Sequence, residues 1–511
     1  MIHCLLYPKN YDQSELLHYF NRSDLISDLR LDQLAKYMGK KDPFIESVML
    51  RVMMIPLQSR ELIYYRHEVI KDCMEHRKEF DELYEICKRC IDRTNQFIKE
   101  NYSRKQVTTS RSLLSEISTY QTMIEDMIEV QGVLDEMQMT SKGLKDFKEQ
   151  MIKEHGMYPT HEIQQLKEDM MALEGGSANQ LYLHLELGLG FKLKNAYIED
   201  IVMDSSKNGV SGFFKKSAQS IGQSLFKSKY LDLNDVSIRE QSEELRIAVF
   251  EQIHKIYMDQ IRKTMPFFEQ LRLEVAFYLG VDNYYHSYRL KSLPLCFPNV
   301  LVGEEKEMRF KRLYEPLLGF QSNGEVVTND SERRKTKVTV ISGANQGGKS
   351  TYLKSIGIAQ IFMQCGMMVN AELFESNCYT EIFSHFSRHE DKNMKYSRFE
   401  EELMRLNQMF DHFTRDSMVL MNESFASTTE QEGSKMASDL THVFYDVGIT
   451  MFFVSHLYQY ATELYTQNLP DVYFLNAERK SDGTRTFKMI EQAPNHTSYG
   501  MDLFDEYIHF S

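Results

Sequence analysis

The sequence lacks the features of a membrane or secreted protein. No apolar run approaches the roughly 20 residues that a membrane-spanning helix requires. The first residues, Met1–Pro8, contain neither a basic region nor a sustained apolar core, so they do not resemble a signal peptide. Cysteine is scarce, and an odd, scattered set of seven is typical of a reducing compartment. These absences predict a cytoplasmic protein that does not interact with a membrane.

Clustered cysteine ligands are also missing. Cys87-Lys88-Arg89-Cys90 is the only C-x-x-C, and no second pair completes a zinc site. Because this segment is charged and helical in character, we interpret it as carrying two free thiols. The formal net charge of −14 argues against a protein that binds nucleic acid over its whole surface, but it leaves room for a local basic track.

Glycine and proline are nearly absent between residues 43 and 156. Apolar residues recur there at spacings of three and four, which is typical of long helices. The clearest series is Leu113, Ile117, Tyr120, Met123, Ile124, Met127, Val130, Leu134 and Met137. A chain of 511 residues is too long for a single core. We therefore predict a short N-terminal segment, 1–40, and a helical core over 41–285.

An irregular, partly basic insert is expected within this helical core, near residues 180–231. Residues 181–201 are strand-like or irregular, and 205–231 carry five lysines and no acidic residue. The lysines could contact a phosphate backbone. The favoured alternative is a mobile, solvated linker.

The last part of the chain alternates strands with helices, the pattern of a parallel α/β sheet. A proline-containing connector, 286–335, is expected before an α/β domain that covers 336–511. The predicted strands are 336–342, 378–383, 417–422 and 450–455, with a hairpin of 472–475 and 486–490. The predicted helices are 352–363, 399–413 and 433–447.

A glycine-rich loop follows the first of these strands and precedes a helix. Its residues fit G-x-x-x-x-G-K-[ST] and are Gly343, Ala344, Asn345, Gln346, Gly347, Gly348, Lys349, Ser350 and Thr351. The glycines let backbone N–H groups form an anion nest at a helix N-terminus. Lys349 would reach the β- and γ-phosphates of a nucleotide, and Ser350 would ligate Mg²⁺. This combination predicts a nucleoside triphosphate site.

Two further apolar strands end in polar side chains. Strand 417–422 ends in Asn422-Glu423, where an ATPase normally has an aspartate that positions Mg²⁺ through water and a glutamate that orients or deprotonates the attacking water. Asn422 offers a carbonyl oxygen without charge, whereas Glu423 keeps the hydrolytic role. Strand 450–455 is followed by His456, which is predicted to lie near the γ-phosphate as a sensor or polariser.

Together these motifs resemble the MutS family of DNA mismatch-repair ATPases. The stretch from Gly343 to Leu353 is similar to the family's G-P-N-x-G-G-K-S-T-Y-L, with Ala344 in place of proline. Ser397-Arg398-Phe399-Glu400-Glu401-Glu402-Leu403 resembles its S-T-F-x-x-E-M signature. Residues 422–433 align without gaps on D-E-x-G-R-G-T-S-T-x-D-G. A weaker resemblance to the family's helical core begins upstream, over 50–57 and 66–70.

The resemblance implies a multidomain fold, in which a mainly α core and lever domain of long helices is followed by a P-loop α/β ATPase domain of ABC/MutS type. It implies a homodimer with composite sites, in which Ser397 of one subunit faces the nucleotide of the other. ATP, Mg²⁺ and DNA are the implied ligands. The implied function is a MutS-like protein, in mismatch repair or recombination, that couples ATP binding and hydrolysis to DNA engagement.

Two departures from the family pattern keep an alternative open. Only about 40 residues precede the helical core, so we expect a short member that lacks the N-terminal mismatch-recognition domain. Asn422 replaces the aspartate, and the glycine-rich, arginine-bearing loop after it is not kept, so hydrolysis is expected to be slow. The alternative is a nucleotide-gated structural or interaction protein with weak hydrolysis and no mismatch recognition.

Overall fold

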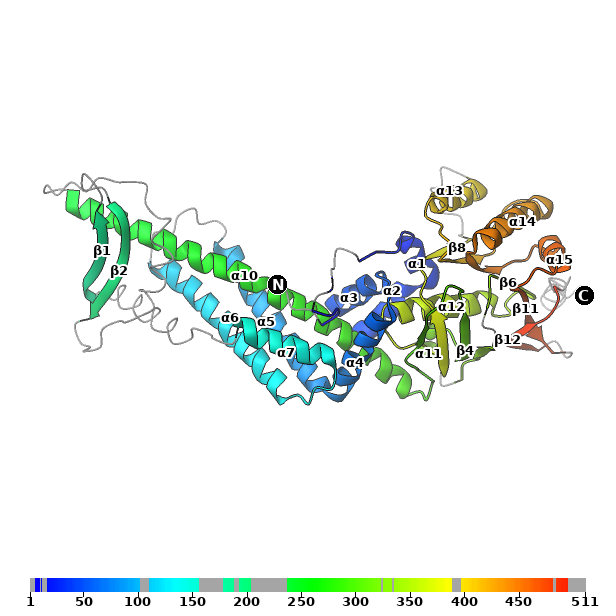
Figure 1. The fold of residues 1–511 in the computed structure, drawn as a ribbon, viewed down its shortest axis with the longest axis horizontal. Coiled ribbons are helices and arrows are strands. Elements are labelled where there is room, and N and C mark those ends of the chain that lie inside the picture. Colours follow the sequence, from blue (N-terminus) through cyan, green and yellow to red (C-terminus); the bar gives the residue numbers. More distant parts are fainter. Residues whose placement is uncertain are drawn as a thin grey trace, which may run out of the picture. The chain divides into compact units, whose positions relative to one another are not determined.

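The computed structural model describes residues 5–9, 11, 16–101, 110–155, 178–187, 193–203, 237–322, 325–332, 335–387, 397–480 and 484–494. The chain, drawn in Figure 1, is divided into two compact units. One includes Lys78–Gln138 and Lys145–Arg272, and the other comprises Leu5–Arg77, Met139–Leu144 and Leu273–Ser511. None of the helices in the described ranges is long and apolar enough to cross a membrane.

The first unit is built mainly from long helices. The described helices of this unit are α5 (Arg77–Asn101), α6 (Ser110–Glu136) and the larger parts of α7 (Lys142–His155) and α10 (Ser237–Arg289). Most of the apolar series predicted for 113–137 is buried along α6, with Leu113, Ile117 and Leu134 fully enclosed, so this helix is confirmed, although it ends at Glu136 and Tyr120 is only partly buried. Charged contacts join α5 to α6, where Arg89 and Arg93 both pair with the nearly buried Asp126.

Two other predictions concern this unit. Cys87 and Cys90 are buried free thiols on α5, as predicted, and burial raises the pKa of both. The strand-like segment forms an antiparallel hairpin of β1 (Ala178–Leu187) and β2 (Leu193–Met203). The lysine-rich stretch 205–231 lies outside the described residues, so its two interpretations remain predictions.

A six-stranded sheet forms the centre of the second unit. Its strands in spatial order are β12 (Arg485–Glu491), β11 (Val472–Arg479), β6 (Val338–Ser342), β10 (Thr450–Val454), β9 (Ser417–Asn422) and β8 (Glu381–Phe386). Neighbouring strands from β11 to β8 are parallel, and β12 is the antiparallel edge. The parallel sheet and the terminal hairpin are therefore confirmed.

Strand β8 departs from the expected position. The strand predicted at 378–383 begins at Glu381, three residues later than expected. The preceding residues are occupied by other contacts, because Tyr379 N–H donates to Gln364 Oε1 and Thr380 N–H donates to the backbone oxygen of Asp416. Apolar composition alone does not reveal where a bond to a side chain, such as that of Tyr379 to Gln364, precedes the start of a strand.

Helices cover both faces of this sheet. Helix α12 (Lys349–Gln364) packs on one face, where a Cβ at Gly357 would lie 2.4 Å from Leu420 Cδ1 of β9. The other face is covered by α13 (Arg398–Phe410), α14 (Glu430–Val447) and α15 (Tyr458–Thr466). Alternate strand residues, including Val340, Met421 and Phe453, form one buried apolar cluster with these three helices. The predicted combination of a helical part and an α/β part is thus confirmed.

A smaller sheet lies beside the glycine-rich loop in the same unit. Its order is β3 (Asn299–Leu301), β7 (Leu373–Asn377), β4 (Met308–Leu313) and β5 (Asn329–Ser331). The stretch 286–335, expected as an irregular connector, supplies three of these strands and the short helix α11 (Pro316–Gln321). It therefore forms part of the wall around the site described below.

The N-terminal helices pack against the α/β part of this unit. They are α1 (Arg22–Leu29), α2 (Leu31–Gly39), α3 (Pro43–Met53) and α4 (Arg60–Glu75). Arg405 of α13 pairs with Asp24 of α1 at 3.1 Å. The fully buried Arg66 of α4 donates to the backbone oxygens of Leu6 and Cys365. The contacts of Arg405 with Asp24 and of Arg66 with Cys365 tie segments that are more than 250 residues apart into one unit.

Candidate functional site

The carboxyl ends of three adjacent parallel strands create the site. Val454, the last residue of β10, pairs with both Ile341 of β6 and Asn422 of β9. Beyond this row, β6 leads into the glycine-rich loop, β9 into Glu423, and β10 into His456. Because parallel strands all point the same way, the polar groups that follow them meet at a single edge.

The glycine-rich loop needs glycine for two different reasons. Gly348 has φ of 90°, a left-handed conformation that glycine adopts without strain, and it is the N-cap of α12. A Cβ at Gly347 would lie 2.6 Å from Ala477 Cβ, so no larger residue fits there. The loop consequently closes tightly over the N-terminus of α12, where backbone N–H groups and the helix dipole favour an anion.

Lys349 begins α12 and turns back over the loop. Its Nζ donates to the backbone oxygens of Gly343, at 2.9 Å, and of Ala344, at 2.8 Å. The side chain is 5% exposed, and this burial lowers the pKa of Lys349 to about 8 although Glu423 favours the charged form. The two carbonyl oxygens therefore do not fully replace the water that the ammonium has lost. An anionic ligand would stabilise the charged form better than these carbonyls do.

Ser350 and Asn422 provide two neutral oxygen ligands beside this lysine. Ser350 Oγ donates to Asn422 Oδ1 at 2.7 Å, which joins the first turn of α12 to the end of β9. Over the described ranges, no group of three or more His, Cys, Asp or Glu side chains could hold a metal ion. A magnesium ion prefers oxygen ligands and often takes few from the protein when it also binds phosphates. Ser350 and Asn422 fit this mode of binding.

Glu423 and His456 form the third part of the site. Glu423 has φ of 56°, which is uncommon for a side chain of its size, and its N–H donates to the oxygen of Val454 at 2.8 Å. Its Oε1 lies 3.2 Å from His456 Nε2. The hydrogen bond to His456 lowers the pKa of Glu423, and the charges of His456 and Lys349 add to this effect. At neutral pH the carboxylate is ionised and accepts hydrogen bonds.

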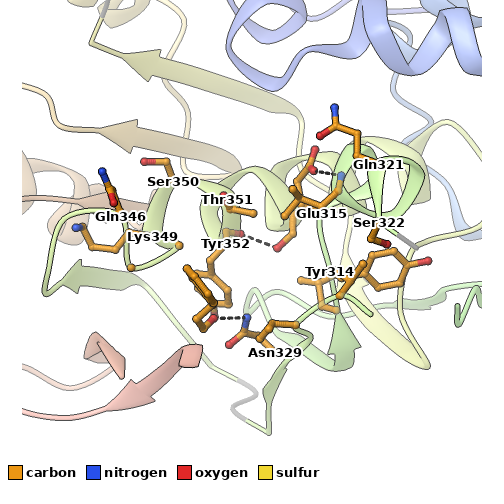
Figure 2. Close-up of a pocket in the computed structure, with 18 of the residues that line it drawn as sticks. Tyr314, Glu315, Gln321, Ser322, Asn329, Gln346, Lys349, Ser350, Thr351 and Tyr352 are labelled. Atoms are coloured by element: carbon orange, nitrogen blue, oxygen red, sulfur yellow. Dashed lines mark hydrogen bonds between the residues drawn. The ribbon is translucent and has the colours of Figure 1, made fainter. Parts of the chain in front are cut away.

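A pocket of about 670 Å³ extends from the glycine-rich loop along the small sheet. Figure 2 shows Gln346, Lys349 and Ser350 at one end of this pocket and Gln321 and Ser322 at the other. Its volume is within the usual range for a small-molecule site. The pocket therefore has a charged end suited to phosphates and a second end remote from them.

Other residues that line the pocket were not singled out by the sequence. They include Leu318 of α11, Val326 and Val327. The ring of Phe487, which is 45% exposed, also lines the pocket and lies beside the glycine-rich loop, since a Cβ at Gly348 would be 3.5 Å from Phe487 Cδ1. On the same hairpin as Phe487, Arg485 Nη1 donates to Gln346 Oε1 at 2.8 Å. No local motif marks these side chains, because they come from the segments 313–329 and 485–489 that meet the loop only in the folded chain.

Ser397 stands apart from this pocket within the described part of the chain. It is exposed and N-caps α13, where its Oγ accepts a hydrogen bond from Glu400 N at 3.2 Å. It does not line the pocket that Lys349, Ser350 and Glu423 share. Its predicted role is in the site of a second subunit and remains a prediction.

Two protein-family models match this chain. The model described as MutS domain V matches residues 339–506, which contain the loop, Asn422, Glu423 and His456. The model described as MutS2 N-terminal domain matches residues 58–290, which contain the long helices. The MutS2 N-terminal model thus matches the helical part, and the MutS domain V model matches the α/β part that follows it in the chain.

Individual relatives match about a third of this chain. The DNA mismatch repair protein MutS of Streptococcus pneumoniae (strain Hungary19A-6) is 28% identical over 171 residues, 33% of this chain and 20% of that protein. The DNA mismatch repair protein HexA of Streptococcus pneumoniae serotype 4 (strain ATCC BAA-334 / TIGR4) gives the same values. MutS of Streptococcus pyogenes serotype M5 (strain Manfredo) is 29% identical over 193 residues, 37% of this chain and 22% of that protein. The match spans about a fifth of the length of these relatives.

The burial of Lys349 predicts a pH-dependent stability. Since its pKa is lowered from 10.5 to about 8, the folded chain loses this proton before the unfolded chain does, and stability rises with pH in this window. Relative to Lys349→Met, the free energy of unfolding of the wild type should rise by roughly 1–2 kcal/mol from about pH 7 to about pH 9.5. Chemical denaturation without nucleotide measures this difference. Lys36→Met, at an exposed position of α2, is the control. If the difference in free energy of unfolding between the wild type and Lys349→Met does not change with pH, the prediction is wrong.

Proposed function

Because this chain belongs to the MutS family, we propose that it binds ATP in the pocket beside β6 and couples ATP binding and slow hydrolysis to DNA engagement as a homodimer. One observation carries the proposal. Lys349, Ser350 and Glu423 line a pocket of about 670 Å³, and Asn422 and His456 adjoin it through their contacts with Ser350 and Glu423, so that polar groups from three strand ends meet. Each of these side chains has a role in binding or cleaving a triphosphate.

The charged end of the pocket would bind the phosphates. The N-terminus of α12 offers backbone donors, and Lys349 adds a buried ammonium. When ATP binds, Lys349 would leave the carbonyls of Gly343 and Ala344 and donate to β- and γ-phosphate oxygens. This exchange replaces two neutral acceptors by charged ones, so a large part of the affinity should depend on Lys349.

The remaining side chains would position the ion and the attacking water. Ser350 and Asn422 would hold Mg²⁺, directly or through water, and the ion would neutralise charge on the phosphates. Glu423 would orient the attacking water, with His456 holding the carboxylate in place. A carboxylate with a lowered pKa is a weak base at neutral pH, so Glu423 is better suited to orienting water than to removing its proton. Slow turnover follows from this and from the neutral Asn422.

The rest of the pocket would accept the nucleoside. The ring of Phe487, which lies beside Gly348 of the loop, would offer a face for stacking against a base, and Val326 and Val327 would supply aliphatic contacts. The hairpin that carries Phe487 also carries Arg485, which holds Gln346 of the loop. Nucleoside contacts and the geometry of the phosphate loop would consequently depend on each other.

A homodimer would complete the site through Ser397. Its Oγ accepts a hydrogen bond from Glu400 N, so its hydroxyl proton can still be donated to a γ-phosphate of the other subunit. The first turn of α13 adds the positive end of a helix dipole. These properties support the composite site that the resemblance implies.

A second candidate is a nucleotide-gated structural or interaction protein that hydrolyses ATP poorly and does not engage DNA. Two observations favour it. Asn422 gives the metal position no charge, and the net charge of the chain is −14. DNA binding would require a local basic surface, for which the lysine-rich stretch 205–231 is the candidate.

Substitution of Lys349 tests nucleotide binding. Lys349→Ala should raise the Kd for ATP by roughly 100-fold, because the phosphates lose a buried charged donor. Isothermal titration calorimetry or a fluorescent ATP analogue measures the change. Lys435→Ala, which removes a solvent-exposed lysine of α14, should leave the Kd unchanged. If neither variant alters ATP affinity, the proposed site is wrong.

Restoring the carboxylate tests the cause of slow turnover. Asn422→Asp should raise the rate of ATP hydrolysis about 10-fold, since a charged ligand binds Mg²⁺ more strongly. Phosphate release at saturating ATP and Mg²⁺ measures this rate, and Asn422→Ala is the control that removes the oxygen altogether. An unchanged or lower rate in Asn422→Asp would show that the site has adapted to the amide.

DNA binding separates the two candidate functions. The MutS-like function predicts binding to at least one of plain, mismatched or branched duplexes, with an affinity that ATP changes and salt weakens. Fluorescence anisotropy with each duplex, with and without ATP, measures it. Undetectable binding to all of them at ~50 mM salt would favour the interaction protein.

A further inference from the structure

The turn that follows β9 holds two large side chains in a left-handed backbone conformation. Glu423 has φ of 56° and Phe425 has φ of 66°. Such values cost conformational energy in residues other than glycine, so surrounding contacts have to maintain them. Residue 425 also aligns with a glycine in the pattern D-E-x-G-R-G. Because this chain has no glycine there, contacts from other residues have to hold the turn in this conformation.

A buried carboxylate of α13 supplies one of these contacts. Glu402 is 4% exposed, and its Oε1 accepts the backbone N–H of Phe425. The Phe425 side chain is 2% exposed and belongs to the apolar cluster beneath the sheet. Burial raises the pKa of Glu402, and the hydrogen bond from Phe425 opposes this effect. Phe425 is thus held through its backbone by Glu402 and through its ring by the core.

His385 of β8 ties the same helix and the same turn together. Its Nε2 lies 3.1 Å from the backbone oxygen of Glu402, and its Nδ1 lies 2.7 Å from Ser424 Oγ. Ser424 Oγ also lies within hydrogen-bond distance of the backbone oxygen of His385. His385 and Ser424 are both almost fully buried, so water does not compete for these bonds. The turn is consequently attached to α13 directly at Phe425 and, through His385, at Ser424.

We propose that Glu402 is a positioning residue for Glu423, acting through the backbone N–H of Phe425. The other flank of Glu423 is held by its N–H bond to Val454 of β10. With both flanks fixed, the Glu423 carboxylate is presented to His456 and to the phosphate end of the pocket. This inference rests on the proposed role of Glu423 in ATP hydrolysis.

The arrangement also connects the two ends of a composite site. Ser397 caps the N-terminus of α13, and Glu402 lies five residues further along the same helix. A movement of α13 that accompanies contact with a second subunit would move the carboxylate that holds the Glu423 turn. Ligand contact at Ser397 and the geometry of Glu423 are therefore coupled through one helix.

Two substitutions change the length and the charge of the Glu402 side chain separately. Glu402→Asp keeps the charge but shortens the side chain, whereas Glu402→Gln keeps the length and an acceptor oxygen but loses the charge. To hold Phe425, the side chain of residue 402 has to be long enough for its oxygen to accept the Phe425 N–H. We therefore expect Glu402→Asp to lower kcat for ATP hydrolysis about 10-fold with the Kd for ATP within about 2-fold, and Glu402→Gln to keep kcat within about 2-fold.

The test combines steady-state phosphate release, ATP titration and hydrogen exchange of residues 423–428 in the full chain. Glu463→Asp and Glu463→Gln are matched controls, because Glu463 is exposed on α15 and does not line the pocket. Neither control should alter kcat or exchange. Exchange of 423–428 should be faster in Glu402→Asp than in the wild type, and this readout does not depend on turnover.

Several results would overturn the inference. These are a normal kcat or unchanged exchange in Glu402→Asp, a loss of ATP affinity equal to the loss of kcat, and activity kept by Asp but lost with Gln. A different result would show that the proposed function itself is wrong. In that case wild-type turnover is not reduced by Lys349→Ala, while hydrogen exchange still decides whether Glu402 holds the turn.

Discussion

The parallel pairing of β6, β10 and β9 is the constraint on which the site depends. Strands in this register end at one edge, so a phosphate loop, a carboxylate and an imidazole from residues 343 to 456 become neighbours. A shift of any strand by one residue would also turn its buried side chains to the opposite face of the sheet. The apolar packing of the sheet and the geometry of the site are therefore maintained by the same register.

Charge is distributed unevenly within this site. Lys349 is a desolvated cation, Asn422 is neutral, and Glu423 is the carboxylate that faces both. An anionic ligand relieves the poor solvation of Lys349, which favours binding. The neutral amide at the metal position and the weak basicity of Glu423 disfavour turnover. Under the proposed function, this site would accordingly hold a triphosphate better than it would cleave it.

Elements with strong periodicity were predictable from the sequence. The helix over 113–137, the strand 417–422 and the hairpin near 472–490 occur where apolar spacing places them. Prediction was poorer where side-chain bonds decide an element's start, as at β8. It also missed the role of 286–335, because weak, short strands such as β3 and β5 are stabilised by pairing with distant segments rather than by their own composition.

The sequence by itself determined the chemistry of the phosphate end. A strand, a glycine-rich loop and a helix are contiguous in the chain, so Gly347, Lys349 and Ser350 carry a local signal. Only the tertiary structure decided what surrounds them. The pocket wall that includes Phe487 and the attachment of the Glu423 turn to Glu402 join residues that are far apart in the chain. Such contacts arise from strand order and helix packing, which no local pattern of residues encodes.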